Sequence, residues 1–403
     1  MKIAFVVPYV PNLIRTRPYN LIVHLAALGH EVEVFTVGSG GQDLTDAEAL
    51  KQRCKAVHFF HQPVWRSLWN SAWAVPTSQP LQTVYSWHTG LMRALADRVA
   101  RKEFDVVHVE HLRGSKYAGF IKSSFPEMPV VWDSVDCISH LFQQAAGQSS
   151  SFFGRFVTAF DLPRTRKAEG TLIERFDRTL VTSSADREAL LALAARDSQP
   201  APILVLPNGV DLDYFKPAPE IQREPETLVF SGKMSYHANV AMVKFLVNAI
   251  MPRVWSKRPQ TKLIVVGKDP SPEIRLLGQN PLIQITGTVD DIRPYLWKAT
   301  ASVVPLLYGA GIQNKILEAM ATGTPVITTT RTLSALEAQL GRDLLAADSA
   351  ETFAGETLRL LDDAAMQGEV GQAGLAYVQA RHDWKAIAGR LVEIYRQAMN
   401  NLM

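Results

Sequence analysis

Cysteine is nearly absent from this sequence, since Cys54 and Cys137 are the only two among 403 residues. Two thiols cannot build a disulfide framework or a structural zinc site. Long apolar runs are also lacking, and no stretch reaches the length that spans a bilayer. The N-terminal run MKIAFVV stops at Pro8, too early for a signal peptide, and no small-residue cleavage site follows. We therefore expect a cytoplasmic protein, and a peripheral contact with the inner face of the plasma membrane stays open.

An excess of one charge is lacking too. The sequence has 42 Lys and Arg against 39 Asp and Glu, a net charge of +3, and the two signs are interspersed. A nucleic-acid-binding stripe needs clustered basic residues, so we expect no nucleic-acid partner. Hydrophobic residues make up 47% and charged residues 20%, which is typical of soluble globular proteins, and the length suits two domains.

Short apolar runs alternate with helix-length segments along the whole chain. The runs are rich in Val and Ile and hardly alternate with polar residues, which predicts parallel strands buried on both faces. In the first half we predict strands at 2–8, 31–37, 56–60, 105–110, 130–133, 179–183 and 203–207, and helices at 18–28, 88–101, 164–176 and 185–193.

The second half repeats this scheme after a Pro-rich joint at 215–226. Its strands are predicted at 227–232, 262–267, 282–287, 301–306 and 325–329, and the last 50 or so residues are helical. The fold class is therefore α/β, with two Rossmann-like, doubly wound parallel-sheet domains. Ligands of such sheets bind at the carboxyl ends of the strands, so we expect a site in the cleft between the two domains.

The segment VVPLLYGAGIQNKILEAMATGTPVITT (303–329) is the most informative in the chain. A strand, a loop with Gly309 and Gly311, and a helix starting near Ile312 together offer free backbone N–H groups and a positive helix end to a phosphate. Lys315 adds a full charge in the first turn. Glu318, one turn on, can accept hydrogen bonds from ribose hydroxyls. This order of groups is typical of a nucleotide site, although any α/β protein has strand–Gly–helix loops.

This segment resembles the signature of the retaining glycosyltransferases of family four, which have the GT-B fold. Their motif is a glutamate, seven residues, a second glutamate and then Ala-Met-Ala-x-Gly-x-Pro-Val, and LEAMATGTPVI (317–327) matches its second part. The resemblance implies that Glu318 holds the nucleotide ribose. The first glutamate, which contacts the donor sugar in the family, is Ala310 here. Gln313 and Asn314 are the candidates to supply those polar contacts.

Other landmarks of the family fall in the same order along the chain. LPNGVDLDYFKP (206–217) resembles the start of the C-terminal domain, and VFSGKMSYHANV (229–240) resembles its first strand and loop. There the family often carries an Arg and a Lys on the pyrophosphate. Lys233 falls on the Arg position, but the Lys position is Ala238, so Lys315 is the candidate replacement. The predicted donor-binding set is Arg17, Gly232, Lys233, Gly311, Ile312, Gln313, Asn314, Lys315 and Glu318.

The N-terminal domain carries two further landmarks. TRPYNLIVHLAALGHEVEVFT (16–36) resembles the family's first helix and second strand, and Arg17 falls where many members have an Arg facing the cleft. DVVHVEHLRG (105–114) ends a predicted strand at the same edge, where many members have His-x-His beside the donor sugar. Glu110 takes the place of the second His, and His111 follows it. The predicted catalytic set is Glu110 and His111, and the choice between them stays open.

Competing interpretations attach to three of these segments. His108, Glu110 and His111 could form a metal cluster, and Asp211-x-Asp213 resembles a metal–nucleotide motif of another fold, although neither has further ligands in its sequence context. The stretch SFFGRFVTAFDLPRTRKAEG (151–170) combines Phe152, Phe153, Phe156 and Phe160 with Arg155, Arg164, Arg166 and Lys167. It could lie on an anionic membrane or be a helix packed under its own domain.

Taken together, the residues and the resemblance predict a hexosyl-type glycosyltransferase independent of metals and cofactors, and the resemblance alone implies that transfer is retaining. Its co-substrate would be a UDP-, GDP- or ADP-sugar, and its acceptor a glycan or a glycolipid of polysaccharide biosynthesis. The resemblance implies domains at 1–212 and 213–383, with the final helix, within 384–403, packed back on the first. The alternatives are a nucleotide-sugar epimerase of the same fold and a catalytically degenerate nucleotide-sugar-binding protein. An NAD-dependent oxidoreductase is disfavoured, because no G-x-G-x-x-G follows the first strand.

Overall fold

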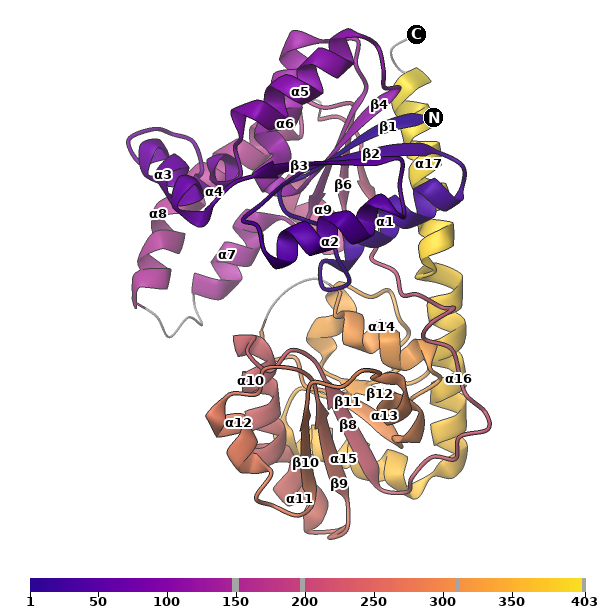
Figure 1. The fold of residues 1–403 in the computed structure, drawn as a ribbon. Helices are drawn as coiled ribbons and strands as arrows, with labels where there is room; N and C mark the ends of the chain where they lie inside the picture. Colours follow the sequence, from indigo (N-terminus) through magenta and orange to yellow (C-terminus); the bar gives the residue numbers. More distant parts are fainter. Residues whose placement is uncertain (147–151, 196–199, 309–311, 401–403) are drawn as a thin grey trace. The chain divides into compact units, whose positions relative to one another are not determined.

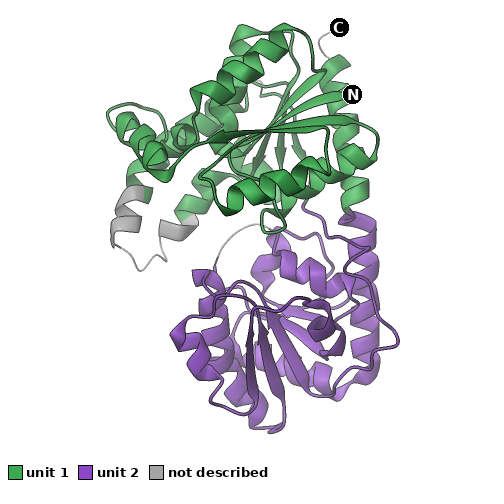
Figure 2. Ribbon diagram, viewed as in Figure 1, with its two compact units in different colours: residues 1–207, 384–403 green, residues 208–383 purple. Residues whose placement is uncertain are grey.

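The computed structural model describes residues 1–146, 152–195, 200–308 and 312–400. The chain forms two compact units, which Figure 2 shows in two colours. Unit 1 consists of Met1–Pro207 and Trp384–Met403, and unit 2 of Asn208–Asp383. Each unit has its own sheet and its own core, so each is described by itself.

Unit 1 contains a seven-stranded parallel sheet (Figure 1). Its strand order is β3-β2-β1-β4-β5-β6-β7, which reverses direction between β1 and β4 and is therefore doubly wound. All seven predicted strands of the first half form. The strands are β1 (Lys2–Val7), β2 (Glu31–Gly38), β3 (Ala56–His61), β4 (Val106–Glu110), β5 (Val130–Val135), β6 (Arg178–Val181) and β7 (Ile203–Val205).

Helices cover both faces of this sheet. Alternate strand residues point to opposite faces, so Ile3 and Phe5 pack with the helices α1, α2 and α17, while Ala4 and Val6 pack with α5, α6, α8 and α9. The helices of unit 1 are α1 (Thr16–Ala27), α2 (Gln42–Lys51), α3 (Val64–Ala74), α4 (Leu81–Tyr85), α5 (Thr89–Ala100), α6 (His111–Ser124), α7 (Ile138–Ala146), α8 (Phe152–Leu172), α9 (Ser184–Leu191) and α17 (Trp384–Asn400).

Two sequence-based expectations about α8 meet the structure differently. The helix predicted at 164–176 begins earlier and ends at Leu172. Its described part is anchored in unit 1, because Asp161, Thr165 and Glu169 are buried and Glu169 accepts from the backbone N–H of Ile138 at 2.7 Å. This favours the packed helix over the membrane-bound one. The side chains of Phe152, Phe153, Arg155 and Phe156 lie outside the described residues.

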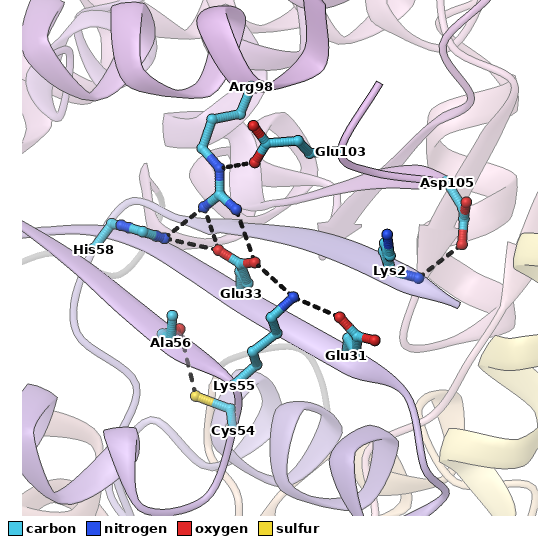
Figure 3. A network of polar contacts seen from close by, with 10 residues as sticks. All are labelled: Lys2, Glu31, Glu33, Cys54, Lys55, Ala56, His58, Arg98, Glu103 and Asp105. Atoms are coloured by element: carbon cyan, nitrogen blue, oxygen red, sulfur yellow. Dashed lines mark hydrogen bonds and ion pairs between the residues drawn. The ribbon is translucent and has the colours of Figure 1, made fainter. Parts of the chain in front are cut away.

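An ion-pair network ties α5 to the edge of the unit 1 sheet (Figure 3). Arg98 of α5 donates both terminal nitrogens to Glu33 of β2, with Nη2 2.8 Å from Oε1. His58 of β3 lies 2.9 Å from the same carboxylate. Burial alone would raise the pKa of Glu33, but the hydrogen bonds from Arg98 and His58 outweigh it and lower the pKa to about 2. The carboxylate is therefore ionised in the folded protein across the ordinary pH range.

Unit 2 repeats the doubly wound architecture with six strands. The order β10-β9-β8-β11-β12-β13 again reverses beside the first strand of the unit. The five predicted strands form, and β13 is an additional two-residue strand. The strands are β8 (Thr227–Ser231), β9 (Lys262–Val266), β10 (Ile283–Gly287), β11 (Ala301–Val304), β12 (Val326–Thr328) and β13 (Leu345–Ala346). The predicted fold class, two Rossmann-like parallel-sheet units, is confirmed.

The helices of unit 2 place the loops that follow its strands. They are α10 (His237–Phe245), the π-helical turn η1 (Leu246–Ile250), α11 (Met251–Trp255), α12 (Pro272–Leu277), α13 (Arg293–Lys298), α14 (Asn314–Ala321), the 3-10 turn η2 (Thr330–Ser334), α15 (Ala350–Asp362) and α16 (Ala364–Arg381). Across the described residues of both units, no helix is both long and apolar enough to cross a bilayer.

Candidate active site

Two glycines bring backbone segments together at the carboxyl edge of the unit 2 sheet. Gly232 follows β8 with φ +150°, and Gly267 follows β9 with φ +149°, a conformation that side chains rarely allow. A Cβ atom on Gly267 would lie 1.8 Å from the carbonyl oxygen of Gly232, so no side chain fits there. The N–H of Gly232 donates to the carbonyl of Val266 at 2.9 Å. The loop after β8 is thus held in place by the next strand.

Lys315 projects from α14 toward this loop. The helix expected from Ile312 begins at Asn314, so Lys315 is in its first turn, as predicted. Its Nζ atom donates to Oδ1 of Asn239 at 2.5 Å and lies 4.4 Å from the centre of the Phe230 ring. A Cβ atom on Gly232 would lie 3.0 Å from that Nζ. The ammonium group therefore lies directly against the glycine loop.

The charge of Lys315 has no close counterion. The side chain is 8% exposed, and within the described residues no carboxylate oxygen lies within 4.0 Å of Nζ. Burial lowers the pKa of Lys315 to about 7, although the carboxylate of Glu318 acts in the opposite direction. A buried ammonium with only a neutral amide as partner is ready to receive an anion.

Glu318 lies one turn further along α14. Its side chain is partly exposed and makes no hydrogen bond or ion pair with any described residue. Burial raises the pKa of Glu318 to about 7, and Lys315 opposes this shift. Neither Glu318 nor Lys315 is a plain surface residue. Both are partly dehydrated groups that would gain from a ligand.

The remaining predicted donor residues differ in their exposure and in their contacts. Lys233 is 49% exposed and pairs with Asp269 at 3.6 Å, so its charge is partly shared. Gln313 is the N-cap of α14, but its side chain does not cap the helix. Ile312 is buried and Asn314 half-buried. Gly311 lies outside the described residues, as does Ala310, so the structure does not address the lost glutamate.

Three polar residues of this region escaped the sequence analysis. Asn239 of α10 donates from Nδ2 to the carbonyl of Lys233 at 2.9 Å and accepts from Lys315, which joins the glycine loop to α14. His237 stacks on Tyr308 with ring centroids 5.6 Å apart and hydrogen-bonds to its hydroxyl at 2.9 Å. The only signal in the sequence was their place just after a strand, which is too common to single them out.

Glu110 and His111 lie together at the carboxyl end of β4 in unit 1. Glu110 is 1% exposed and accepts a hydrogen bond from the Tyr9 hydroxyl at 2.9 Å. Burial and the nearby Asp133 raise its pKa to about 8, so the carboxyl group is protonated at neutral pH. His111 has φ 65°, which is unusual for a residue with a side chain, and it starts α6. The structure thus buries Glu110 and leaves His111 partly exposed.

The chemical state of His111 follows from its surroundings. Burial lowers the pKa of its imidazole to about 3, and the Arg113 guanidinium adds to the shift. The backbone N–H of Arg113 donates to Nδ1 at 3.2 Å. Because a neutral imidazole carries one proton and Nδ1 is the acceptor, the proton resides on Nε2. His111 is therefore a neutral hydrogen-bond donor.

Arg17 is buried inside unit 1 and forms an ion pair. Its side chain is 4% exposed, its Nη2 lies 2.8 Å from Asp133, and its Nη1 donates to the carbonyl of Leu206 at 2.9 Å. This guanidinium links α1, β5 and the segment after β7 inside unit 1. A buried charge in such a pair stabilises the architecture of unit 1, and donor binding by Arg17 stays a prediction.

The proposed metal clusters do not assemble. The side chains of His108 and Glu110 go to different partners, since His108 Nδ1 lies 2.9 Å from the Tyr395 hydroxyl of α17. Asp211 accepts from the backbone N–H groups of Asp213 and Tyr214, which is the role of a turn cap. Among the described residues, no three His, Cys, Asp or Glu side chains converge as metal ligands.

Comparison with known proteins accounts for both units. The glycosyl transferases group 1 family matches residues 225–363, and the glycosyl transferase 4-like domain matches residues 14–209. The chain belongs to the glycosyl transferases group 1 family. It is a glycosyltransferase that uses a nucleotide-sugar donor, as the LEAMATGTPVI segment indicated.

Two curated relatives of this glycosyltransferase act on inositol compounds, according to their names. The D-inositol 3-phosphate glycosyltransferase of Kineococcus radiotolerans is 25% identical over 95% of this chain and 89% of its own length. The phosphatidyl-myo-inositol mannosyltransferase of Mycobacterium leprae is 28% identical over 47% of this chain and 52% of its own length. The latter match spans about half the length of that relative.

Solved structures share the fold of this glycosyltransferase. Sucrose-phosphate synthase from Thermosynechococcus elongatus aligns over 100% of both chains with a TM-score of 0.70 at 19% identity. HepE from Anabaena, solved with UDP-glucose, aligns over 98% of this chain and 99% of its own with a TM-score of 0.65 at 16% identity. At such identities the likeness shows the fold alone, which is GT-B.

Proposed function

We propose that this enzyme transfers a hexosyl group from a nucleoside diphosphate sugar, held by unit 2, to a hydroxyl of a polyol, lipid-linked or glycan acceptor. We further propose that transfer retains the anomeric configuration and needs no metal ion. The observation that carries the proposal is the uncompensated ammonium of Lys315, which lies against the Gly232 loop at the start of α14. A diphosphate would supply the missing counterion, and the family supplies the reaction class.

The donor is proposed to lie along α14, with its diphosphate at the start of the helix and its ribose one turn further on. Its diphosphate would contact the Gly232 loop, Lys315 and Lys233, and its ribose hydroxyls would donate to Glu318. Lys315 lies next to Asn239, one residue beyond Ala238, where family members carry a lysine. A lysine on α14 therefore brings the same charge to the phosphate from another element.

Departure of the diphosphate is the step that this arrangement would favour. As the bond between the anomeric carbon and the β-phosphate oxygen breaks, negative charge grows on that oxygen. Lys315, Lys233 and the positive end of α14 are already in place and would stabilise this charge without reorganising. In metal-dependent enzymes a divalent ion does this work.

On the unit 1 side we propose that His111 is the residue that contacts the sugar. It is the more exposed of the two candidates, and its Nε2–H can donate to a sugar hydroxyl. Glu110, buried and protonated, is a positioning residue that holds the end of β4 through Tyr9. This assigns the two candidates separate roles.

For the acceptor, the curated relatives favour a polyol hydroxyl. Their names describe transfer to an inositol phosphate and to an inositol lipid. We therefore propose an acceptor with a phosphorylated polyol, free or carried on a lipid, ahead of a plain glycan.

A two-stage experiment tests the proposal. First, UDP-, GDP- and ADP-sugars are screened for a rise in melting temperature, because a ligand that binds only the folded state stabilises it. The radiolabelled donor is then incubated with inositol phosphate, phosphatidylinositol and a glycan, and NMR reports the anomeric configuration of the product. We expect transfer with retention to a polyol acceptor.

Other outcomes of this experiment would contradict the proposal. Isomerisation of the donor without an acceptor would indicate an epimerase. Donor binding with no transfer to any acceptor would indicate a degenerate binding protein.

A further inference from the structure

The helix α3 (Val64–Ala74) has its apolar side chains on the outside. Trp65, Trp69 and Trp73 are 67%, 60% and 67% exposed, and Leu68 between them is 59% exposed. Their spacing of three and four residues places them on one face of the helix. A helix of a globular protein normally turns such a face inward, so this orientation calls for an explanation.

Polar contacts on the opposite face fix this orientation. Ser67 is 5% exposed and accepts a hydrogen bond from Gln62 Nε2 at 2.9 Å, and Asn70 donates to the carbonyl of Trp87 at 2.9 Å. Turning the helix to bury its tryptophans would break these hydrogen bonds. The outward tryptophans are therefore a built feature of unit 1. We call Val64, Trp65, Leu68, Trp69 and Trp73 the α3 face.

The sequence on either side of the α3 face lacks acidic residues. There is no Asp or Glu from residue 49 to residue 96, whereas Arg66 of α3 lies within that span. Arg164 of α8 donates to the carbonyls of Val75 and Thr77, just beyond the C-terminus of α3. A partner with negative charge would complement this surface, because α3 and the segments beside it in the sequence have no acidic residue that would repel it.

A hollow beside the α3 face contains a lysine without a partner. The hollow has a volume of about 360 Å³, and its walls include Trp69, Trp73 and Trp87. Lys116 of α6 enters it, with Nζ 4.6 Å from the centre of the Trp87 ring. Among the described residues, Lys116 has no hydrogen-bond acceptor or counterion, and burial lowers its pKa. An anionic group that reached this hollow would meet an ammonium framed by indole rings.

The hollow adjoins a second, larger one with the same character. This cavity of about 540 Å³ shares Trp87 and Lys116 with the first and is lined by Phe120, Lys167 and Arg175, with no acidic residue. The two hollows together offer apolar walls and cations beside exposed indoles. That combination suits an amphiphile with an anionic head.

We propose that the α3 face docks on an anionic phospholipid bilayer and that Lys116 binds the phosphate of one lipid. Indole rings favour the membrane–water interface, where the ring is buried and the N–H stays hydrated. Basic residues beside them add attraction to anionic headgroups. A second copy of the chain is a poorer occupant, because a two-fold contact through α3 would bring the same cations together without any acid. This proposal does not rest on the proposed transfer reaction.

Binding to lipid vesicles tests the proposal without any donor or acceptor. The full chain is sedimented with phosphatidylcholine vesicles that either contain or lack phosphatidylglycerol, and inorganic phosphate is added in a third arm. We expect binding that increases with phosphatidylglycerol and that inorganic phosphate weakens only slightly. Changing Trp65, Trp69 and Trp73 together to Ser should lower the partition coefficient by about tenfold for each indole lost.

Two further variants separate the parts of the surface. Lys116→Gln should leave binding to neutral vesicles unchanged. It should reduce the increase in binding caused by phosphatidylglycerol by about fivefold. Leu276→Ser, at a leucine of α12 in unit 2 that is 59% exposed, is the matched control and should bind like the wild type. Melting temperatures of all variants should equal that of the wild type, because every changed apolar side chain is exposed.

The proposal fails if the triple tryptophan variant binds vesicles as well as the wild type does. It also fails if the wild type ignores vesicles and sedimentation shows a dimer that the triple variant cannot form. In that case a second copy of the chain covers the α3 face.

Discussion

The opposed titrations of Lys315 and Glu318 predict a specific pH dependence of donor binding. Both groups have a pKa of about 7 in the free protein, and both are charged in the proposed complex. Protonated Lys315 favours the diphosphate, so its contribution to affinity falls as the pH rises through 7. Ionised Glu318 favours the ribose, so its contribution grows over the same range. In the wild type the two dependences cancel only near pH 7, where affinity for UDP or GDP should be highest. Above pH 7 the loss of charged Lys315 outweighs the at most twofold gain of ionised Glu318, so affinity should fall by about eightfold between pH 7 and 8.5.

Single variants should reveal the pH dependence that is due to each of the two residues. In Glu318→Gln, the pKa of Lys315 falls further because the carboxylate that raised it is gone. Affinity should then weaken by about fifteenfold or more from pH 7 to 8.5, given the tenfold loss of the charged form per pH unit above its pKa. In Lys315→Met, the pKa of Glu318 rises further, and affinity should improve by up to about tenfold, the difference between neutral and charged hydrogen bonds. At pH 7 each variant should bind roughly ten- to hundredfold more weakly than the wild type.

Isothermal titration calorimetry with UDP and with GDP measures these slopes. The lower limit of pH 7 keeps the terminal phosphate ionised, since phosphate monoesters titrate near pH 6. Lys262→Met, at the exposed start of β9, is the control and should follow the wild type. Methionine at position 315 fills the space of the lysine, so the variant tests charge and not packing. Slopes of equal sign in the two variants, or wild-type affinity in both, would refute the placement of the donor.

Three further predictions concern other parts of the chain. His111→Ala should lower kcat by about tenfold or more, the usual size of a lost transition-state hydrogen bond, with UDP affinity unchanged, and a shift in UDP affinity instead would show that this residue acts on the nucleotide. Transfer should persist in EDTA, because Lys233 and Lys315 can neutralise the diphosphate, whereas loss of turnover that magnesium or manganese restores would show that a metal does so. Glu33→Gln should lower the free energy of unfolding by about 2 kcal/mol at pH 7, after discounting for partial solvent screening. Since the folded pKa of Glu33 is depressed to about 2, this stability is present above pH 4.5 and is lost as the pH falls from 4.5 toward 2, so urea unfolding at pH 3 should show a much smaller gap.

The strands were predictable from sequence because both sheets are parallel and covered on two faces. The run IAFVV that follows Lys2 in β1 is therefore apolar and buried at every position, and no alternation pattern is needed to recognise it. The two-residue β13 is too short to leave such a run. Element ends were less predictable, as the later start of α14 shows. The residues at its start also contact other loops, and local propensity does not report those contacts.

Tertiary partners set the limits of prediction at the site. Arg17 and Asp133 are separated by 116 positions in the sequence, and no local sequence pattern predicts their ion pair. Asn239 reaches Lys315 across 76 positions for the same reason. Helix α3 illustrates another limit, because periodicity reveals that one face is apolar but not whether that face is turned inward. The proximity of Lys315 and Glu318 was predictable because a single helix carries both.

The C-terminal helix has a consequence for how the protein is made. Trp384, Ile387 and Leu391 of α17 are buried with β1 and α1 in the same apolar cluster of unit 1. Unit 2 is continuous in sequence, so its core is assembled from one uninterrupted stretch of chain. Unit 1, although its strands emerge first, has only α1 and α2 on this face of its sheet until residues 384–398 have been released. A nascent chain thus carries an exposed apolar strip for nearly the whole of its synthesis, and any product truncated before Trp384 would be a natural target for chaperones and proteases.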